Sequence, residues 1–504
     1  MDTFDMLMRG FAIALTPTNL FLGAIGCIFG TFVGAMPGIG APTGIAVLLP
    51  LTFGMNPTSG IIMLAGIYYG SMYGGTISSV LVNVPGESAS VMTALEGHKM
   101  ALRGRAGTAL TVSAAGSFIA GTIGVVGLML LAEPVAAFGL KFGPPEQFAL
   151  FLFAFTSLIG FSSDSRAKTL VAIILGLLIA TIGNDPLSGR SRFTFGSIDL
   201  MGGIDFVTVA VGIFGIGEVM IAFEQNYRME FVTSRLGLKD IFPTAREWAA
   251  SFWPIVRGTV LGFMVGILPA AGATVAAFMS YGVEKQLSRH PEEFGNGAIE
   301  GVAGPEAANN SATAGAMVPL LTLGIPGSAS TAVMLGAFMI WGLRPGPLLF
   351  SKNPDFVWGL IASMYVGNVL LLILNVGFIP AFVRMLRIPF SALMALVVVF
   401  CVMGSYTLGG SLFDIWVMVA FGVLGYVMKK LDFPQAPLVF AVVLGPLAEV
   451  TFRQALTMSQ GSAAIFVASP IAATLVAGAF LVLAGPLMWV WLRRMKISAG
   501  GGGA

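Results

Sequence analysis

Long runs without any charged or histidine side chain dominate the chain. They cover 10–86, 106–132, 258–283, 307–343, 356–383, 388–413 and 455–492. A helix that crosses a bilayer needs about 20 apolar residues, and division of the longer runs at this length predicts roughly ten to twelve membrane helices. The expected fold is therefore an all-α integral membrane protein with many spans.

Composition and charge narrow the class further. Of the 504 residues, 56% are hydrophobic and 10% are charged, whereas a soluble domain carries about 25% charged residues. The net charge of +2 is too small to indicate a nucleic-acid partner. The beginning MDTFDMLMRG has no basic segment followed by a cleavage site, so no removable signal peptide is expected.

Groups that could carry enzyme chemistry are sparse. Cys27 and Cys401 lie in apolar runs, where they are expected to be buried filler, and His98 and His290 stand alone. The chain has no GxxxxGK[ST] segment to hold ATP phosphates and no HExxH or Ser–His pattern. We therefore expect no enzyme activity and no cofactor or metal, apart from a possible Na⁺ as coupling ion.

Two Pro-Gly breaks interrupt the apolar sequence in the same way. Residues 82–90 read VNVPGESAS and residues 323–331 read LGIPGSAST. Broken backbone is costly in hydrocarbon, so it survives only inside protein or along a watery cavity. Paired interruptions in the two halves of a membrane protein are the sequence mark of a transporter's binding site.

The two halves of the chain also resemble each other. Residues 30–46 and 262–278 align without gaps and place Gly30, Gly34, Pro37 and Gly40 opposite Gly262, Gly266, Pro269 and Gly272. This pattern predicts a first repeat at 1–222, with motifs at 34–44 and 83–90, and a second at 251–492, with motifs at 266–276, 304–315 and 324–331. Chance similarity between glycine-rich membrane segments is the alternative.

Charge placement suggests how the repeats are oriented. Lys99, Arg103 and Arg105 follow the first break, and by the positive-inside rule this loop is cytoplasmic. The loop after the second break is much less basic, which favours an inverted repeat. Between the halves, 223–250 is expected to be an interfacial linker helix rather than a binding module. The end, 493–504, is expected to be a cytoplasmic or disordered tail.

The breaks offer two kinds of ligand. A helix N-terminus exposes N–H groups that attract anions, and freed carbonyl groups bind cations. The expected substrate ligands include Ser88, Ser90, Ser328, Ser330 and Thr331. Sodium ligands are expected near Asn83, Gly86, Asn310 and Gly327, with Pro85 and Pro326 making the breaks. The alternative is an ordinary turn in which Ser88 or Ser328 caps the next helix.

Two further motifs add small and polar groups. GAMPGIGAPTG (34–44) and GILPAAGATVA (266–276) suit a tight hairpin or close helix packing, with Gly38, Gly40, Thr43, Gly272 and Thr274 as the residues of interest. GPEAANNSATAG (304–315) clusters Asn309, Asn310, Ser311 and Thr313, whose side chains suit Na⁺ or a carboxylate. Its counterpart in the first half is expected at 68–76, YYGSMYGGT, and its alternative is a capping loop.

One acidic residue stands out by its isolation. Glu87 ends a long uncharged region, and an acid inside a membrane is a candidate for binding a cation or carrying a proton. It could equally lie in the first turn of a helix at the interface, where an acid is favourable. Glu306 has the same ambiguity.

The motifs at 34–44, 68–90 and 304–330 resemble the large membrane subunit of the tripartite tricarboxylate transporters, the TctA family. The resemblance covers about 15–490. It implies a multi-pass protein of the bacterial inner membrane that works with a small membrane subunit of about four helices and a periplasmic solute-binding protein. It also implies carboxylate substrates, coupling to Na⁺ or H⁺, and an architecture related to elevator-type transporters.

The function expected is therefore ion-coupled import of tri- or dicarboxylates. A channel with the glycine-rich hairpins as its filter, an intramembrane enzyme and an assembly subunit without its own substrate site are the alternatives.

Overall fold

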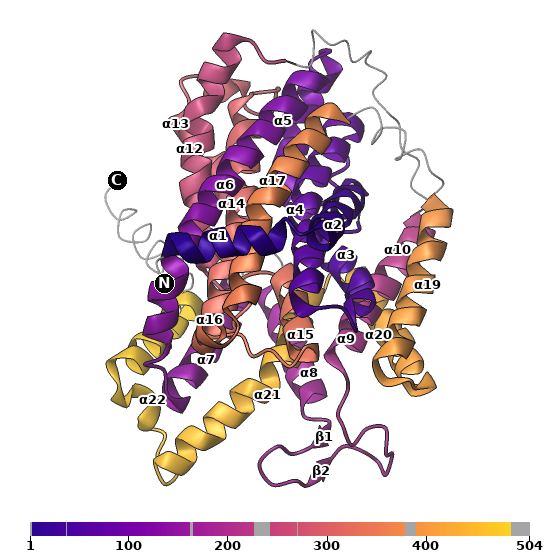
Figure 1. Cartoon of the computed structure of the whole chain (residues 1–504), viewed down its shortest axis with the longest axis vertical. Helices are drawn as coiled ribbons and strands as arrows, with labels where there is room; N and C mark the ends of the chain where they lie inside the picture. The colour runs from indigo at the N-terminus through magenta and orange to yellow at the C-terminus, as the bar shows by residue number, and fades with distance from the viewer. Residues whose placement is uncertain are drawn as a thin grey trace, which may run out of the picture. The chain divides into compact units, whose positions relative to one another are not determined.

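The computed structural model describes residues 3–36, 38–161, 165–225, 242–269, 271–378 and 390–484. Within these residues the regular structure is helical, apart from a two-residue antiparallel pairing of β1 (Gly183–Asn184) with β2 (Ser191–Arg192) (Figure 1). This confirms the expected all-α class. Pro37, residues 226–241 of the expected linker helix and the 493–504 tail lie outside the described residues.

Seven helices of the described part are long and apolar enough to cross a membrane. They are Pro17–Ala35, Ala106–Gly139, Phe206–Glu224, Ala245–Ile267, Pro354–Gly377, Leu412–Lys430 and Gln435–Met458. Shorter apolar helical stretches occupy Ala41–Thr52, Ala329–Ile340, Met394–Thr407 and Pro470–Ala484. The chain is thus a multi-pass membrane protein, while the total of ten to twelve spans stays a prediction.

The chain divides into two compact units. Unit 1 comprises residues 1–139 and 205–430. Its helices are α1 (Thr3–Ala14), α2 (Pro17–Ala35), α3 (Ala41–Leu48), η1 (Leu49–Thr52), α4 (Pro57–Val82), η2 (Ser88–Ser90), α5 (Val91–Leu102), α6 (Ala106–Gly139), α9 (Phe206–Ala210), the π-helix η3 (Val211–Ile216), α10 (Gly217–Gln225), α12 (Ala245–Ile267), α13 (Gly272–Leu287), η4 (Pro291–Glu293), α14 (Glu300–Leu323), α15 (Ala329–Ile340), α16 (Pro347–Lys352), α17 (Pro354–Gly377), α19 (Phe390–Gly409) and α20 (Leu412–Lys430).

Unit 2 comprises residues 140–204 and 431–504. Its described elements are α7 (Pro144–Phe161), α8 (Arg166–Ala180), β1, β2, α21 (Gln435–Met458), α22 (Ile465–Ala468) and the apolar helix 470–484. The boundaries of the two compact units differ from those of the two predicted repeat halves, since each unit contains residues of both halves. A compact unit is defined by packing and a repeat by sequence similarity, so the two divisions need not coincide. Both Pro-Gly breaks lie in unit 1.

Glycines let two pairs of helices in unit 1 approach until their backbones touch. A Cβ added at Gly26, Gly30 or Gly34 of α2 would overlap the α4 backbone. In the same way, a Cβ at Gly258 or Gly262 of α12 would overlap the α14 backbone. Small residues permit such packing in membranes, where helices have little hydrophobic drive to associate.

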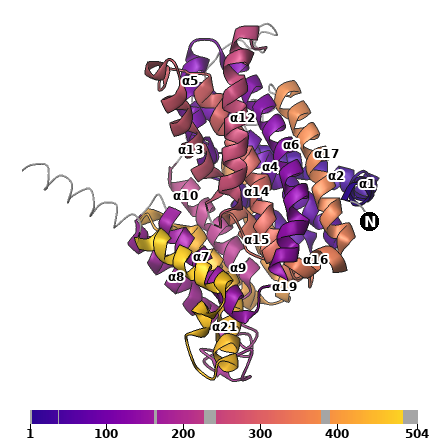
Figure 2. The ribbon, with the colours of Figure 1, turned by 90° about the vertical axis from the view of Figure 1, so that its left-hand side faces the viewer.

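Within each of these helix pairs, successive glycines contact residues at a constant separation in sequence. Gly30 meets Ile67 and Gly34 meets Ser71, whereas Gly262 meets Ala308 and Gly266 meets Ala312. Figure 2 shows α12, α13 and α14 side by side. A repeat would produce matched contacts of this kind, and both the repeat and its inverted orientation stay predictions.

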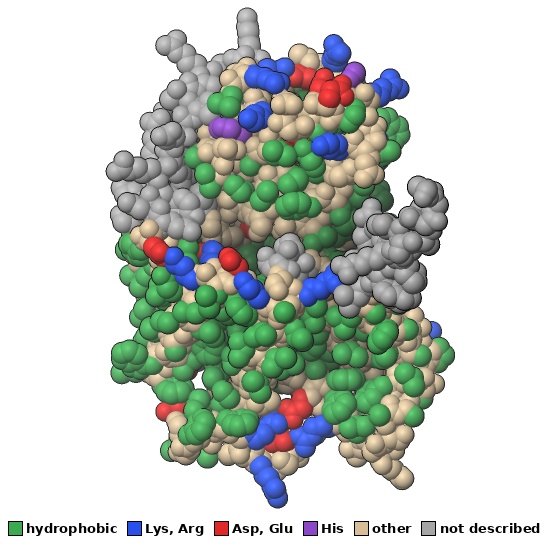
Figure 3. Space-filling view, turned by 180° about the vertical axis from the view of Figure 1, so that it is seen from behind, with side chains coloured by type: hydrophobic (Ala, Val, Ile, Leu, Met, Phe, Trp, Pro, Cys, Tyr) green, Lys and Arg blue, Asp and Glu red, His purple; other side chains and the backbone are tan. Residues whose placement is uncertain are grey.

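The outer surface of the helices is largely apolar. Exposed side chains include Ile119, Ile123 and Leu130 on α6 and Phe252 and Val260 on α12. Figure 3 shows hydrophobic side chains spread broadly over the face that it draws, with charged side chains gathered in small groups. A soluble protein rarely exposes apolar patches of this extent, so the surface suits contact with lipid.

Candidate functional site

The first break, residues 83–90, ends α4 and leads through η2 into α5. Asn83 adopts a left-handed conformation with φ of 58°, which terminates α4 at Val82. Gly86 then passes so close to the Gly34 carbonyl that a Cβ would overlap it. Only glycine fits this approach, so the Pro-Gly pair sets the path of the break.

Glu87 points from the break towards the N-terminus of α3. Its Oε2 accepts hydrogen bonds from the Ala41 backbone N–H at 2.7 Å and from Ser71 Oγ at 3.1 Å. The residue is 9% exposed. The sequence left open whether Glu87 lies inside the protein or in an exposed first turn. The structure buries it, and its carboxylate takes the place of an anion at the α3 N-terminus.

The second break also begins at a residue in the left-handed conformation, but a serine stands after its Pro-Gly pair where the first break has Glu87. Gly324, in a left-handed conformation with φ of 71°, ends α14. Ser328 then caps α15 through a capping box with Thr331, as the turn alternative expected. Ser88, by contrast, caps nothing, because Glu87 holds the N-cap position of η2.

The two halves meet at these breaks. Tyr68 Oη on α4 lies 3.0 Å from Ser328 Oγ. A Cβ added at Gly272, the first residue of α13, would lie 3.7 Å from Ser328 Cβ, just as one at Gly40 would contact the Glu87 carboxylate. In addition η2 packs against α13, and α15 packs against α3. The predicted half-sites are thus adjacent, each beside a hairpin motif.

A second polar cluster surrounds Glu306 in the middle of α14. Glu306 is fully buried. Thr93 of α5 donates a short hydrogen bond to its Oε1, and Asn309 Nδ2 donates to Oε2 at 3.3 Å. The hydroxyls of Thr76 on α4 and Ser113 on α6 lie beside this carboxylate, and Ser113 Oγ donates to Thr76 Oγ1 at 3.3 Å. Polar side chains from four helices, α14 itself included, therefore surround one buried acid.

Asn310 extends the cluster towards α6. Its Nδ2 donates to Ser117 Oγ at 2.7 Å, to Asn309 Oδ1 at 2.6 Å and to the Glu306 carbonyl at 3.1 Å. Its Oδ1 is buried without a partner, as is Tyr73 Oη of α4. Buried polar atoms without partners cost free energy, so atoms of this kind mark sites that a ligand, water or proton serves.

The other residues predicted from the sequence differ in their burial and in their hydrogen bonds. Ser311 donates to the Thr259 carbonyl at 2.8 Å, and Thr313 donates to its own helix at the Asn310 carbonyl. Ser90 donates to the Glu87 carbonyl at 2.7 Å, which braces the break. The rest comprise buried Thr43, Gly86, Pro326, Gly327 and Ser330, half-buried Pro85 and Thr274, exposed Ser88 and Asn83, and Gly38, whose φ is 82°.

The motif 304–315 lies within helix α14, which continues through Pro305. The capping-loop alternative for this motif is therefore wrong. The sequence missed Thr93, Ser113 and Ser117 as partners of Glu306 and Asn310. Ser113 and Ser117 stand four residues apart in an uncharged run, which places them on one helix face and was a usable signal. Thr93 gave no such signal.

Other charged groups of unit 1 serve as braces. Glu96 accepts from the N–H groups of Gly297 at 2.7 Å and Ala298 at 3.0 Å and from Tyr281 Oη at 2.7 Å. Arg257 forms an ion pair with the buried Glu284. Arg257 is therefore engaged within the protein.

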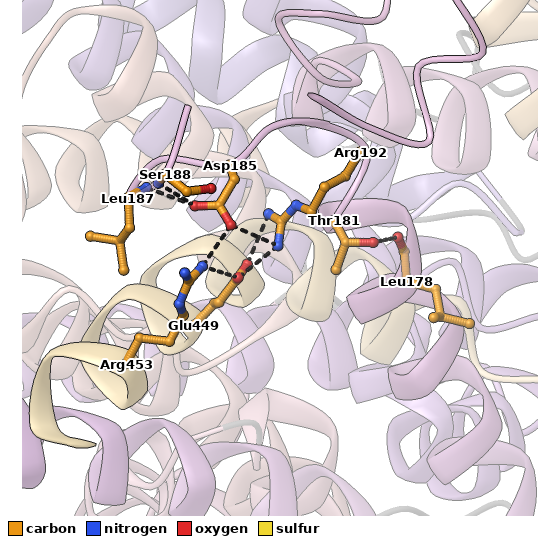
Figure 4. A network of polar contacts seen from close by, with 8 residues as sticks. All are labelled: Leu178, Thr181, Asp185, Leu187, Ser188, Arg192, Glu449 and Arg453. Carbon is orange, nitrogen blue, oxygen red and sulfur yellow. Dashed lines mark hydrogen bonds and ion pairs between the residues drawn. The ribbon is translucent and has the colours of Figure 1, made fainter. Parts of the chain in front are cut away.

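Unit 2 holds a network of two carboxylates and two arginines (Figure 4). Arg192 donates to both oxygens of Glu449, at 2.7 and 3.1 Å, while Arg453 donates to Asp185 at 2.7 Å. Hydrogen bonding from Arg453 holds the pKa of Asp185 well below its usual range. The network ties the β1–β2 hairpin to α21.

The family model for the tripartite tricarboxylate transporter TctA family matches residues 20–440, which contain both breaks, the hairpin motifs and the Glu306 cluster. The chain belongs to the TctA family. TctA proteins are transporters, so the expectation of a non-enzyme is confirmed, and family membership places the chain in a tripartite system with other components.

Two relatives of this TctA protein come from Agrobacterium vitis. One, described as an uncharacterized 52.8 kDa protein in the TAR-I ttuC' 3' region, is 44% identical over 477 residues and 95% of each chain. The other, described as an uncharacterized protein in the TAR-II ttuC' 3' region, is 47% identical over 214 residues, which cover 42% of this chain and 88% of the relative. No solved structure matches the chain.

Proposed function

We propose that this TctA protein imports tri- or dicarboxylates across the bacterial inner membrane, driven by an ion gradient. It would receive its substrate from a periplasmic solute-binding protein and work with a small four-helix membrane subunit. The observation that carries the proposal is the contact of the second break with the first half, where Tyr68 Oη on α4 lies 3.0 Å from Ser328 Oγ. Broken helices at the junction of two halves are typical substrate sites of secondary transporters.

The difference between the breaks indicates where a carboxylate would bind. In the first half, the Glu87 carboxylate accepts the N–H group at the start of α3. In the second half, the equivalent residue beside the start of α13 is Ser328, and no side chain of the described residues caps α13. The first N–H groups of a helix lack intrahelical partners. A substrate carboxylate at α13 would therefore make the contacts that Glu87 makes at α3.

The groups around this position would bind a carboxylate without a fixed guanidinium. Ser328 and Tyr68 supply hydroxyls, and the N-terminal ends of α13 and α15 supply N–H groups. Alternating access would then follow from movement of one set of helices against another around the site. This part of the proposal includes the elevator-type movement that the family resemblance implies.

The test is uptake into proteoliposomes that contain this subunit, its small partner and the binding protein. Labelled citrate and several dicarboxylates would be supplied under an imposed Na⁺ or H⁺ gradient. We expect accumulation above the external concentration for at least one carboxylate, and the loss of most uptake in Ser328→Ala. Thr407→Ala is the matched control, because Thr407 is exposed and its hydroxyl returns to its own helix at the Met403 carbonyl.

The alternatives give different results in the same experiment. A channel would equilibrate the solute without accumulating it. An assembly subunit without its own site would leave uptake unchanged in Ser328→Ala. Either result would contradict the proposal.

A further inference from the structure

Glu306 is a buried acid without a buried positive charge to balance it. In the described part of the chain its hydrogen-bond partners are the Thr93 hydroxyl and the Asn309 amide, with the Thr76 and Ser113 hydroxyls beside them, and none of these groups is a cation. The residue has no exposed surface. An unpaired charge inside a membrane protein is expensive, and uptake of a proton removes that charge.

We infer that Glu306 is the proton-carrying group of the transport cycle, so that the coupling ion of this protein is H⁺. The inference deepens the proposed function and rests on it. Nothing in the family match or in the relatives assigns a role to Glu306. Its side chain would gain a proton in one state of the cycle and release it in another. The surrounding donors would stabilise the charged form while the proton is absent.

The packing favours a proton over Na⁺ at this position. A cation held by oxygen ligands needs a central space about 2.4 Å from each oxygen. Here the Thr93 hydroxyl donates directly to Oε1, and Asn309 Nδ2 donates directly to Oε2 at 3.3 Å. The donors therefore fill the positions around the carboxylate that a cation would take. A proton needs no such space.

Two unpartnered atoms give the proton a route. Tyr73 lies on α4, one turn before Thr76, whose hydroxyl is beside the Glu306 carboxylate. Asn310 Oδ1 belongs to the same network. Both atoms are buried and unsatisfied. A water molecule or the proton itself would use them as its next hydrogen-bond partners.

Other titratable groups lie farther along the helices that pack against α14. A Cβ at Gly304 would contact Glu284, which is paired with Arg257, and a Cβ at Gly301 would contact Glu96. Residues 106–132 of α6 and the whole of α15 contain no charged residue or histidine. The remaining titratable groups on α14 and on the elements packed against it are Glu300 on α14, Glu87 beside η2, Tyr68 and Tyr69 on α4, His98 and Lys99 on α5, Glu133 on α6, Arg246 and Glu247 on α12, Tyr281 and Lys285 on α13, and Lys352 on α16. Among these groups, Glu284 and Glu96 are held by an ion pair and by hydrogen bonds, whereas Tyr69 Oη is buried without a partner in the described part of the chain.

The first experiment needs no substrate. Infrared difference spectra of the purified full-length subunit in lipid, taken between acid and alkaline pH, report the carbonyl band of a protonated buried carboxylic acid. We expect Glu306→Gln to remove one such band, and the exposed Glu133→Gln on α6 to leave it unchanged. A wild-type spectrum without a titrating buried acid, or a band that survives in Glu306→Gln, would overturn the inference.

The second experiment uses the three-component proteoliposomes, with citrate as the probe. A pH gradient of one unit supports about tenfold accumulation for each proton carried. We expect Glu306→Gln to lower the ratio of internal to external citrate about tenfold for each unit of the pH gradient. The variant should still exchange internal for external citrate, because this exchange needs no net proton movement. Accumulation by Glu306→Gln under a pH gradient, or wild-type accumulation under Na⁺ alone, would overturn the inference.

The two experiments separate the inference from the proposed function. If the wild type moves no carboxylate while the Glu306 band titrates, the transport proposal fails and the assignment of a proton site survives. If the wild type accumulates citrate while the band is absent, the transport proposal stands and the proton site is wrong.

Discussion

Replacement of Gly262 by alanine tests whether the backbone contact between α12 and α14 positions the candidate site. A Cβ at Gly262 would lie 2.6 Å from the Ala308 Cα and 2.7 Å from its carbonyl carbon. Carbon atoms in contact are normally 3.5–4.0 Å apart. The two helices would therefore have to separate by about an ångström. Because α14 carries Glu306, Asn309 and Asn310, this movement would also displace the buried polar cluster.

The expected loss of stability follows from two opposing effects. Overpacking of a close contact costs about 1–3 kcal/mol and more where backbone must move. Alanine in place of a helical glycine contributes about 1 kcal/mol in the other direction. The net loss expected for Gly262→Ala is about 1–3 kcal/mol. Gly282→Ala on α13 is the matched control, because no atom lies within 4 Å of the added Cβ, and it should be neutral or stabilising.

Thermal unfolding of the purified protein in detergent, followed by tryptophan fluorescence, measures both variants. We expect a lower Tm for Gly262→Ala and an equal or higher Tm for Gly282→Ala. Carboxylate uptake should fall in the first variant alone. Equal Tm values and equal uptake for the two variants would refute the claim that this contact sets the position of α14.

Three further predictions follow from individual contacts. A double-mutant cycle with Tyr68→Phe and Ser328→Ala should give a coupling energy of about 1 kcal/mol in Tm-based stability, whereas additive effects would contradict a direct hydroxyl contact. Glu96→Gln should speed amide hydrogen exchange in the loop before α14, because its carboxylate accepts three N–H groups of that loop; unchanged exchange would show that the brace is dispensable. Asp185→Asn should lower the Tm above about pH 4, where the carboxyl of the unfolded chain is charged. This difference in Tm should vanish as the pH falls, because Arg453 lowers the pKa of Asp185 in the folded protein. A difference that does not depend on pH would contradict the ion pair.

The sequence predicted the helical membrane class and the position of the breaks well, because both depend on local composition. Runs without charge specify spans, and Pro-Gly in such a run has few structural uses. The glycines aligned between 30–46 and 262–278 include Gly34 and Gly266, whose carbonyl groups face Gly86 and Gly327 of the two breaks. These features need no knowledge of which helices are neighbours.

The composition of the Glu306 cluster could not be predicted in the same way. Thr93, Ser113 and Thr76 are brought to Glu306 by the packing of three separate helices against α14, and a single sequence does not specify such pairings. Likewise the sequence left the role of Glu87 open, because its burial depends on how α3 lies against α4. Residues 304–315 looked compatible with a loop, since glycine, proline and asparagine favour turns, but tertiary packing holds them in a helix.

Substrate protection at the second break tests the central claim most directly. Cys27 and Cys401 are both fully buried, whereas Ser328 is partly exposed, so Ser328→Cys introduces the more accessible thiol, beside the start of α13. Its rate of reaction with a small water-soluble thiol reagent would be measured with and without a carboxylate that the proteoliposomes take up, and Ser351→Cys on exposed α16 would serve as control. We expect the carboxylate to slow the reaction at position 328 and to leave position 351 unchanged. Equal rates at position 328 with and without a transported carboxylate would contradict a substrate site at the paired breaks.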